Sequence, residues 1–291
     1  MQIHALRTGF VQIKRAQQIG VGHGLARRVR PFLDSTWTDW LPTYAWAIEH
    51  EEGVIVVDTG AASGDAHLRS WHPYHRFDVR FRVEAHEELG PQLRALGIKT
   101  SDVSKVVVTH LHMDHGAGLP HVADRPTFVH MGEVQAARGL SGRLQGYLPG
   151  QWGRGFGPQG LSWQGQPLGP FESTAPLTRA GDVVAVQTPG HTPHHLSVVV
   201  KGDVNIFLAG DTSYTQDALL AGQVDGVSPD EGQAQSTLRR IRLLAAERPL
   251  VYLPTHDPES AHRLSILDVV TPTASTGQAG NASDISTCHK T

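Results

Sequence analysis

The sequence predicts a mixed α/β fold in which short strands and helices pack in layers. Segments with strand character and segments with helical character alternate, in the order strands, helix, strand, helix, strands, helix, strand. Residues 106–108 are three consecutive valines, and such a β-branched run is typical of a strand buried on both faces. Apolar residues make up 39% of the chain, which is enough for a substantial core.

Short apolar runs mark the predicted strands. Residues 45–48 and 54–57 flank a polar turn that ends at Gly53, and this pattern predicts a β-hairpin. The first ten residues lack the apolar core of a signal peptide, so we expect them to form the first strand. Further strands are expected at 106–108, 126–130, 183–187, 196–200, 205–208 and 250–253.

Three segments predict helices. Leu89, Leu93 and Leu96 lie at helical spacing, and Gly97 after them is typical of a helix end. Residues 132–138 favour a second helix. A third is expected to begin at Ser228-Pro229, with the serine as its cap, and its apolar stripe would consist of Leu238, Ile241 and Leu244.

Two stretches have no clean period. Residues 61–85 predict a long surface connection, and a connection of this length is often functional or part of an interface, so a homodimer contact is one possibility. Residues 139–170 are rich in glycine but contain Tyr147, Trp152, Phe156 and Trp163. These aromatic residues favour an ordered loop over an apolar site rather than a disordered insertion.

Composition excludes several classes of protein. A formal net charge of −3 argues against a nucleic-acid partner, and no apolar run is long enough to span a membrane. The single cysteine, Cys288, excludes an intrachain disulfide and a cysteine-rich zinc site, and we expect a cytoplasmic protein. The basic cluster Arg27, Arg28 and Arg30 is interpreted as a solvated surface turn.

The domain organisation is expected to be simple. We predict one folded domain over residues 1–270. Residues 271–291 are small and polar, which favours a disordered tail.

The string His110-Leu111-His112-Met113-Asp114-His115 is the most informative part of the sequence. It directly follows the buried valine run, and on an extended segment His110 and His112 point to the same side. Asp114 and His115 follow where the chain turns, so they can face a neighbouring ion. Four nitrogen and oxygen donors in this order favour a metal site over a cluster of surface histidines, and they suit zinc, iron, manganese or cobalt.

Three distant donors also follow predicted strands. His191 lies in a Pro-Gly-His turn, Asp211 follows Ala209-Gly210, and His256 follows Pro254-Thr255. A side chain at a strand end can be aimed by its loop and held by the sheet. We therefore expect these three donors to complete the site.

This set of donors resembles the ligand set of the metallo-β-lactamase superfamily. Asp58-Thr59-Gly60 also matches an early motif of that family, and the resemblance runs from about residue 43 to residue 257. It implies a four-layer αβ/βα sandwich with two divalent metal ions, expected to be zinc, at one edge. The donors that carry it are His110, His112, Asp114, His115, His191, Asp211 and His256.

The resemblance also implies how the donors are shared. His110, His112 and His191 would hold one ion, and Asp114, His115 and His256 would hold the second. Asp211 would bridge them. Two ions of this kind can hold a bridging hydroxide and polarise a carbonyl.

Tyr214, three residues after Asp211, looks like the substrate-contacting tyrosine of the N-acyl-homoserine lactonase branch. The expected reaction is attack of the bridging hydroxide on a small-molecule lactone. Tyr214 would stabilise the oxyanion and Asp114 would carry the proton. The alternative is a tyrosine packed beneath its loop. His195 matches the usual second histidine of the turn at 191 and His194 is additional; either could orient a ligand or simply pack.

Three other functions stay open. The first is another hydrolase on the same metals: a thioesterase of the glyoxalase II type, a phosphodiesterase or a β-lactamase. The second is an iron oxidoreductase of the same fold, and the third is a binding protein with structural metals. Tyr214 argues for the lactonase against the first group, and the complete donor set argues against the third.

Overall fold

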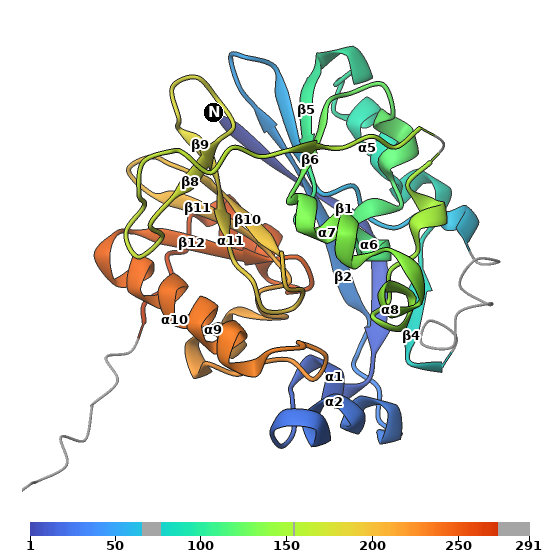
Figure 1. Cartoon of the computed structure of the whole chain (residues 1–291). Helices are drawn as coiled ribbons and strands as arrows, with labels where there is room; N and C mark the ends of the chain where they lie inside the picture. The colour runs from blue at the N-terminus through green and yellow to red at the C-terminus, as the bar shows by residue number, and fades with distance from the viewer. Residues whose placement is uncertain (66–76, 154, 273–291) are drawn as a thin grey trace, which may run out of the picture.

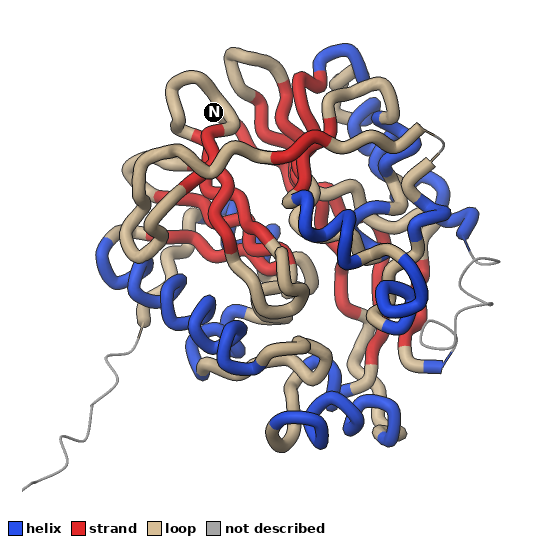
Figure 2. Tube along the Cα trace, viewed as in Figure 1, coloured by secondary structure: helices blue, strands red, loops and turns tan. Residues whose placement is uncertain are grey.

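Two β-sheets face each other at the centre of the computed structural model, which describes residues 1–65, 77–153 and 155–272 (Figure 1). Helices lie on the outer sides, as Figure 2 shows. The first sheet has the order β4 (Val79–Arg82), β1 (Gln2–Ile13), β2 (Leu41–Glu49), β3 (Val54–Val57), β5 (Val103–Val107), β6 (Thr127–Val129) and β7 (Gln159–Gly160). The second has the order β12 (Leu250–Pro254), β11 (Asn205–Gly210), β10 (Leu196–Val200), β9 (Val183–Gln187) and β8 (Thr174–Pro176).

The helices lie between these strands along the chain. Short 3-10 helices supplement them at Ser63–Asp65, Ala85–Glu87, Thr100–Asp102, Leu119–Val122 and Pro149–Gln151. The α-helices are α1 (Arg15–Gln18), α2 (Gly24–Leu33), α5 (Leu89–Ala95), α6 (Met113–Gly116), α7 (Met131–Ala136), α8 (Gly139–Leu144), α9 (Gln216–Ala221), α10 (Glu231–Glu247) and α11 (Ser260–Ile266).

Three apolar clusters account for the layers. One fills the space between the sheets, and it includes Ile55 and Val107. Val56 adjoins Ile55 in β3, and Val106 adjoins Val107 in β5. Both belong instead to the cluster on the outer face of the first sheet. The third cluster lies between the second sheet and α10. Because alternate residues of β3 and of the end of β5 face different layers, these segments appear in the sequence as continuous apolar runs. The predicted four-layer αβ/βα sandwich is confirmed.

Strand direction places several loops at the same edge. β3, β5 and β6 are mutually parallel, so the loops after β3 and β5 leave at one end of the first sheet. In the second sheet β11 is parallel to β12, and β9 runs the same way because both β9 and β11 are antiparallel to β10. The loops after β9, β11 and β12 therefore also leave together, and these are the loops that carry the predicted donors.

The third predicted helix begins later than expected. α10 starts at Glu231, and its cap is Asp230, whose side chain accepts from the backbone N–H of Gln233 at 3.0 Å. Ser228 is not the cap, because its hydroxyl donates to Asp225 Oδ2 at 2.8 Å. The serine belongs to the preceding turn, so its capping role was a wrong prediction.

The basic cluster at 27–30 is not a surface turn. It lies on α2, and Arg27 is buried, with its guanidinium donating to the backbone carbonyls of Asp225 and Ser228. Arg28 and Arg30 are exposed. The buried arginine attaches α2 to the loop that precedes α10.

The two irregular stretches contain more structure than their sequences indicate. Residues 79–82 of the first form strand β4, which pairs with β1. The second contains α8 and the short strand β7, and two of its aromatic residues, Tyr147 and Trp152, are buried. Residues 66–76, which include much of the expected dimer contact, and nearly all of the expected tail at 271–291 lie outside the described residues. No helix of the described ranges is both long enough and apolar enough to cross a membrane.

Candidate metal centre

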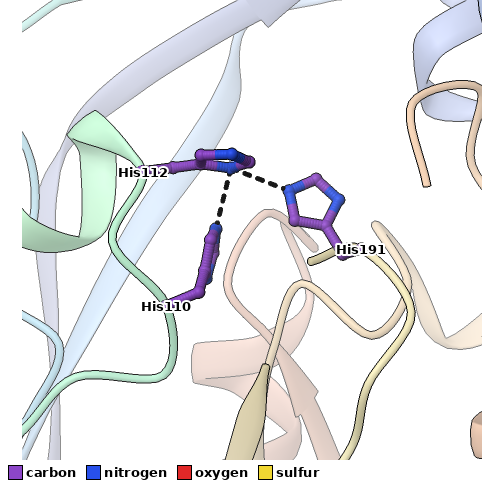
Figure 3. Close-up of side chains that lie close together, drawn as sticks. All are labelled: His110, His112 and His191. Carbon is purple, nitrogen blue, oxygen red and sulfur yellow. Dashed lines mark hydrogen bonds between the residues drawn. The ribbon is translucent and has the colours of Figure 1, made fainter. Parts of the chain in front are cut away.

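Three imidazoles from two loops converge at the edge of the sandwich. His110 and His112 come from the loop after β5, and His191 comes from the loop after β9 (Figure 3). His112 Nδ1 lies 3.0 Å from His110 Nε2 and 3.1 Å from His191 Nε2. Two nitrogens bound at about 2.0–2.1 Å to a tetrahedral zinc ion would be about 3.3 Å apart. The three nitrogens are therefore spaced to hold one ion.

A second group of donors adjoins the first. One ligand atom each of Asp114, His115 and His256 lie within 4.8 Å of one another. His256 Nε2 is 3.4 Å from Asp114 Oδ2. Asp114 and His115 belong to α6, a single helical turn that begins directly after His112. The His115 ring also lies close to the first group, with its centroid 4.0 Å from that of His110.

Asp211 lies between the two groups. Its Oδ1 is 3.3 Å from His115 Nε2, and its Oδ2 is 3.5 Å from His191 Nε2 and 3.4 Å from His256 Nε2. The carboxylate thus reaches donors of both groups. The structure brings together all seven residues that the sequence singled out as metal ligands.

Each of the five imidazoles has a partner for its second ring nitrogen. His115 Nδ1 faces Asp58 Oδ2 at 2.9 Å, and His191 Nδ1 faces Asp225 Oδ2 at 3.2 Å. A partner of this kind fixes the tautomer and the ring orientation of a metal ligand. The remaining second-nitrogen contacts are His110 with Thr109 Oγ1, His112 with the carbonyl of Gln145, and His256 with the carbonyl of Pro42.

The donors differ in their electrostatics. Burial opposes protonation of His191, but its hydrogen bond to Asp225 outweighs burial and raises its pKa. Burial lowers the pKa of His110 well below its usual value and that of His112 to about 3, so both rings are neutral and offer a lone pair. Burial also opposes protonation of His256, but Asp211 and Asp114 outweigh it and raise its pKa to about 10. The carboxylates Asp211 and Asp114 therefore stabilise a positive charge beside them.

The residues present fit a pair of divalent cations. Within the described residues, His115 Nε2 and Asp211 Oδ1 are buried atoms without a hydrogen-bond partner, and they lie 3.3 Å from each other. Unpaired buried polar atoms are rare in folded proteins, and a metal ion would satisfy both. Imidazole and carboxylate donors suit zinc, and also iron, manganese or cobalt.

Tyr214 lies beside the donors. Its ring stacks on His256, with centroids 5.4 Å apart and an interplanar angle of 26°, and it is buried. Its hydroxyl accepts a hydrogen bond from Gln17 Nε2 at 3.1 Å. Tyr214, Gln17, Asp114 and Asp211 all line one small cavity of about 40 Å³.

Three buried polar residues near the donors were not singled out from the sequence. Glu133 accepts from the hydroxyls of Tyr147 and Thr192 and from the N–H of Leu111, so it ties together the loops that carry the first three imidazoles. Asp225 Oδ2 faces Nδ1 of His191, and Gln17 donates a hydrogen bond to the Tyr214 hydroxyl. Each is an isolated polar residue whose partner lies far along the chain, so no local pattern marks it.

The two further histidines of the 191–195 turn have different contacts. His195 Nε2 accepts from the backbone N–H of Asp211 at 3.0 Å, so it orients the loop of that carboxylate. His194 stacks on His130, with centroids 4.8 Å apart. His195 supports a metal-site loop, whereas His194 packs outside the donor groups.

Comparison with known proteins points to the same family. The chain is 32% identical to a probable metallo-hydrolase of Mycobacterium tuberculosis over 182 residues, which is 59% of this chain and 57% of that protein. It is 25% identical to an N-acyl homoserine lactonase of Bacillus cereus, over 75% of this chain and 82% of that protein. The chain therefore spans little more than half the length of the mycobacterial protein.

Solved structures share the fold. An N-acyl homoserine lactone hydrolase with the product N-hexanoyl-L-homoserine at its metal centre superimposes with a TM-score of 0.71. The alignment covers 88% of this chain and 93% of that one, at 18% identity. The model of the metallo-beta-lactamase superfamily matches residues 38–256, which include all seven donors. The chain belongs to the metallo-beta-lactamase superfamily.

Proposed function

We propose that this chain is a metal-dependent hydrolase that opens the lactone ring of N-acyl-homoserine lactones. His110, His112 and His191 would hold one divalent ion, Asp114, His115 and His256 a second, and Asp211 would contact both. Zinc is the expected metal. Two such ions, when bound, supply an acidified water and a Lewis acid for the substrate carbonyl.

Two side chains of the protein act on the substrate in this proposal. Gln17 donates a hydrogen bond to the Tyr214 hydroxyl, and a phenol that accepts a hydrogen bond can also donate one. Tyr214 donates its O–H hydrogen to the carbonyl oxygen as negative charge develops there. Asp114 Oδ2 faces His256, and Asp114 Oδ1 takes the proton of the attacking water and passes it to the leaving ring oxygen.

The position of Tyr214 carries the proposal. A phenol that stacks on His256 and lines the same cavity as Asp114 and Asp211 can reach a carbonyl held at the donors. The lactonases of Bacillus cereus and Rhizobium radiobacter among the relatives support the same substrate class.

A substrate panel tests the proposal. Protein with quantified metal content is assayed with N-hexanoyl-homoserine lactone, S-lactoylglutathione, a phosphodiester and a cephalosporin. We expect kcat/KM for the lactone to exceed the others by about a hundredfold or more. Chelation should abolish the activity, and added zinc should restore it. Faster turnover of the thioester, the phosphodiester or the β-lactam would refute the lactonase assignment.

A further inference from the structure

Helix α2 buries an arginine and exposes most of its apolar residues. Arg27 and Pro31 are the buried residues of this helix. Leu25, Phe32 and Leu33 are 74%, 55% and 74% exposed. A surface helix of a globular protein normally shows the reverse arrangement, with its apolar stripe on the core and its charges in water. The outer face of α2 is therefore suited to an apolar surrounding.

The apolar residues of α2 form one stripe. Leu25, Val29 and Leu33 follow one another at intervals of four residues, and Phe32 lies beside them on the same face. Arg27 lies about half a turn around the helix axis from the centre of this stripe. Its guanidinium attaches the helix to the loop before α10. The stripe therefore faces away from that attachment.

Helix α8 has the same character. Its buried residue is Gly142, whereas Leu140 and Leu144 are 74% and 73% exposed. These two leucines are four positions apart, so they share a helical face. The two helices lie near each other toward the bottom of Figure 1, and residues of both line one cavity of about 260 Å³. We call the exposed residues of 24–33 and 138–144 the α2–α8 patch.

The charges of the patch are all positive. Arg28 and Arg30 of α2 are exposed, and so are Arg138 and Arg143 at α8. Residues 24–33 and 138–144 contain no aspartate and no glutamate. Among the described residues, Arg28, Arg30 and Arg138 form no ion pair. The patch thus combines exposed leucines with arginines that have no carboxylate partner within it.

This combination is complementary to an anionic bilayer. A helix with leucine and phenylalanine on one side and arginine beside them lies in the plane of the interface, with its apolar face among the headgroups. Arginine adds attraction to anionic lipids. We propose that the α2–α8 patch docks on the surface of an anionic lipid bilayer, with both helices lying along it.

A second copy of the chain fits the patch less well. The commonest dimers have twofold symmetry, so the patch would face itself and bring arginines of both copies together. The carboxylates beside α2 are already engaged. Asp34, the residue after α2, accepts hydrogen bonds from Thr36 and from the N–H of Ala16. Glu231 faces His23 at 2.8 Å. The repulsion between the two sets of arginines would therefore have little compensation.

Docking would place the bilayer beside the metal centre. His112 and His191 line the same cavity of about 260 Å³ as residues of the two helices. Apolar molecules concentrate in a bilayer, so a lipid-dissolved substrate would meet the protein at this cavity. Binding to lipid requires no turnover, and the proposal can therefore be tested whether or not the chain is a lactonase.

Vesicle sedimentation tests the patch. The full chain is mixed with vesicles of phosphatidylcholine alone, or of phosphatidylcholine and phosphatidylglycerol in equal parts, at low and at high salt. We expect the protein to sediment with the anionic vesicles at low salt. Its partition coefficient should fall about tenfold or more with the zwitterionic vesicles and at high salt, because both remove the attraction of the arginines.

Substitutions in the patch should weaken binding. Arg30→Gln and Arg138→Gln should each lower the partition coefficient about fivefold. Leu33→Ser should lower it about three- to tenfold, because an inserted apolar side chain is lost. Arg239→Gln and Leu243→Ser are the matched controls, since both residues are exposed on α10, outside the patch. These two variants should bind as the wild type does.

Two results would overturn the proposal directly. One is a wild type that does not sediment with anionic vesicles at low salt, and the other is equal binding by the wild type and the patch variants. A lipid-free wild type of twice the chain mass, reduced to the single mass by Leu33→Ser, would assign the patch to a contact between copies and would also overturn it.

Discussion

The metal centre and the α1–α2 segment lie side by side but are built in different ways. The donors follow the ends of β5, β9, β11 and β12, and four of them, His110, His115, Asp211 and His256, are almost completely buried. The α1–α2 segment, residues 15–33, makes polar contacts with the rest of the chain, among them Arg27 to two carbonyls and Gln17 to Tyr214. Leu25, Val29 and Phe32 of α2 line a cavity of about 260 Å³.

The difference separates the donors, which must keep their positions, from a segment whose exposed residues can vary. Sheets hold the donors within the tolerance that a metal ion demands, because each strand end is fixed by its neighbours. A helical segment attached at a few points can change its exposed residues without disturbing those strands. We therefore expect substitutions at the donors to affect every substrate, and substitutions of exposed α2 residues to leave the donors in place.

The largest effect is expected at Asp114. Asp114→Asn removes the carboxylate that faces His256 at 3.4 Å, and we expect kcat to fall by about a hundredfold to ten thousandfold for every chain length. Asp124→Asn is the matched control, because Asp124 is an exposed carboxylate that pairs with Arg125. Metal content is measured in parallel. Near-normal turnover by a metal-loaded Asp114→Asn protein would refute the proton-carrying role.

A smaller loss of activity is expected at Tyr214, whose hydroxyl contacts the α1–α2 segment through Gln17. Tyr214→Phe should lower kcat/KM by about 1–3 kcal/mol of transition-state stabilisation. Gln17→Leu should lower kcat more than it changes KM, because Gln17 acts through the phenol. In the Tyr214→Phe background, Gln17→Leu should have no further effect. Additive losses in this double-mutant cycle would mean that Gln17 acts independently of Tyr214.

Asp58 tests the support behind the second group of donors. Its backbone has φ 59°, a left-handed conformation that asparagine tolerates, so Asp58→Asn should fold. Losing the carboxylate beside His115 should weaken metal affinity about tenfold to a hundredfold, measured by competition with a chromophoric chelator. Asp182→Asn, which alters a histidine–aspartate contact with His50 away from the donors, should bind metal normally. Equal affinities for the two variants would contradict the supporting role of Asp58.

The convergence of the seven donors could be predicted from the sequence because its signals are local. The donors lie in the loops that follow apolar β-runs, and His110, His112, Asp114 and His115 lie within six residues. The layered fold could also be predicted, since β3 and the end of β5 show the apolar runs of strands buried on both faces.

The α1–α2 segment could not be predicted in this way. α2 contains Pro31 in its last turn, has no side-chain cap, and turns its apolar residues toward a groove instead of a core. A helix is recognised from sequence by a stripe that packs on the core and by its end signals, and α2 offers neither. Arg27 also reads as a surface residue because its carbonyl partners, at Asp225 and Ser228, lie about 200 positions further on.

Arg27 tests how firmly this segment is attached. Arg27→Met leaves the carbonyls of Asp225 and Ser228 without their buried donor, so we expect the free energy of unfolding to fall by about 1–2 kcal/mol. Arg30→Met, on the exposed side of the same helix, should change it by less than about 0.5 kcal/mol. Denaturant titration measures both. Equal stabilities would mean that α2 is held by its other contacts.

The smallest effect is expected at Asp34, which anchors the start of the segment. Its carboxylate accepts from Thr36 and from the N–H of Ala16, and the hydrogen bond from the Thr36 side chain is the main reason why its pKa falls from 3.8 to about 2. A pKa that is lower in the folded protein favours folding above the unfolded-state pKa, and this contribution is lost as the pH falls toward 2. Asp34→Asn should therefore lower Tm by no more than a few degrees near pH 6, and the difference from the wild type should shrink as the pH approaches 3. A difference that stays constant over this range would show that the charge of Asp34 does not help to hold the segment, whose attachment would then depend on Arg27 and Gln17.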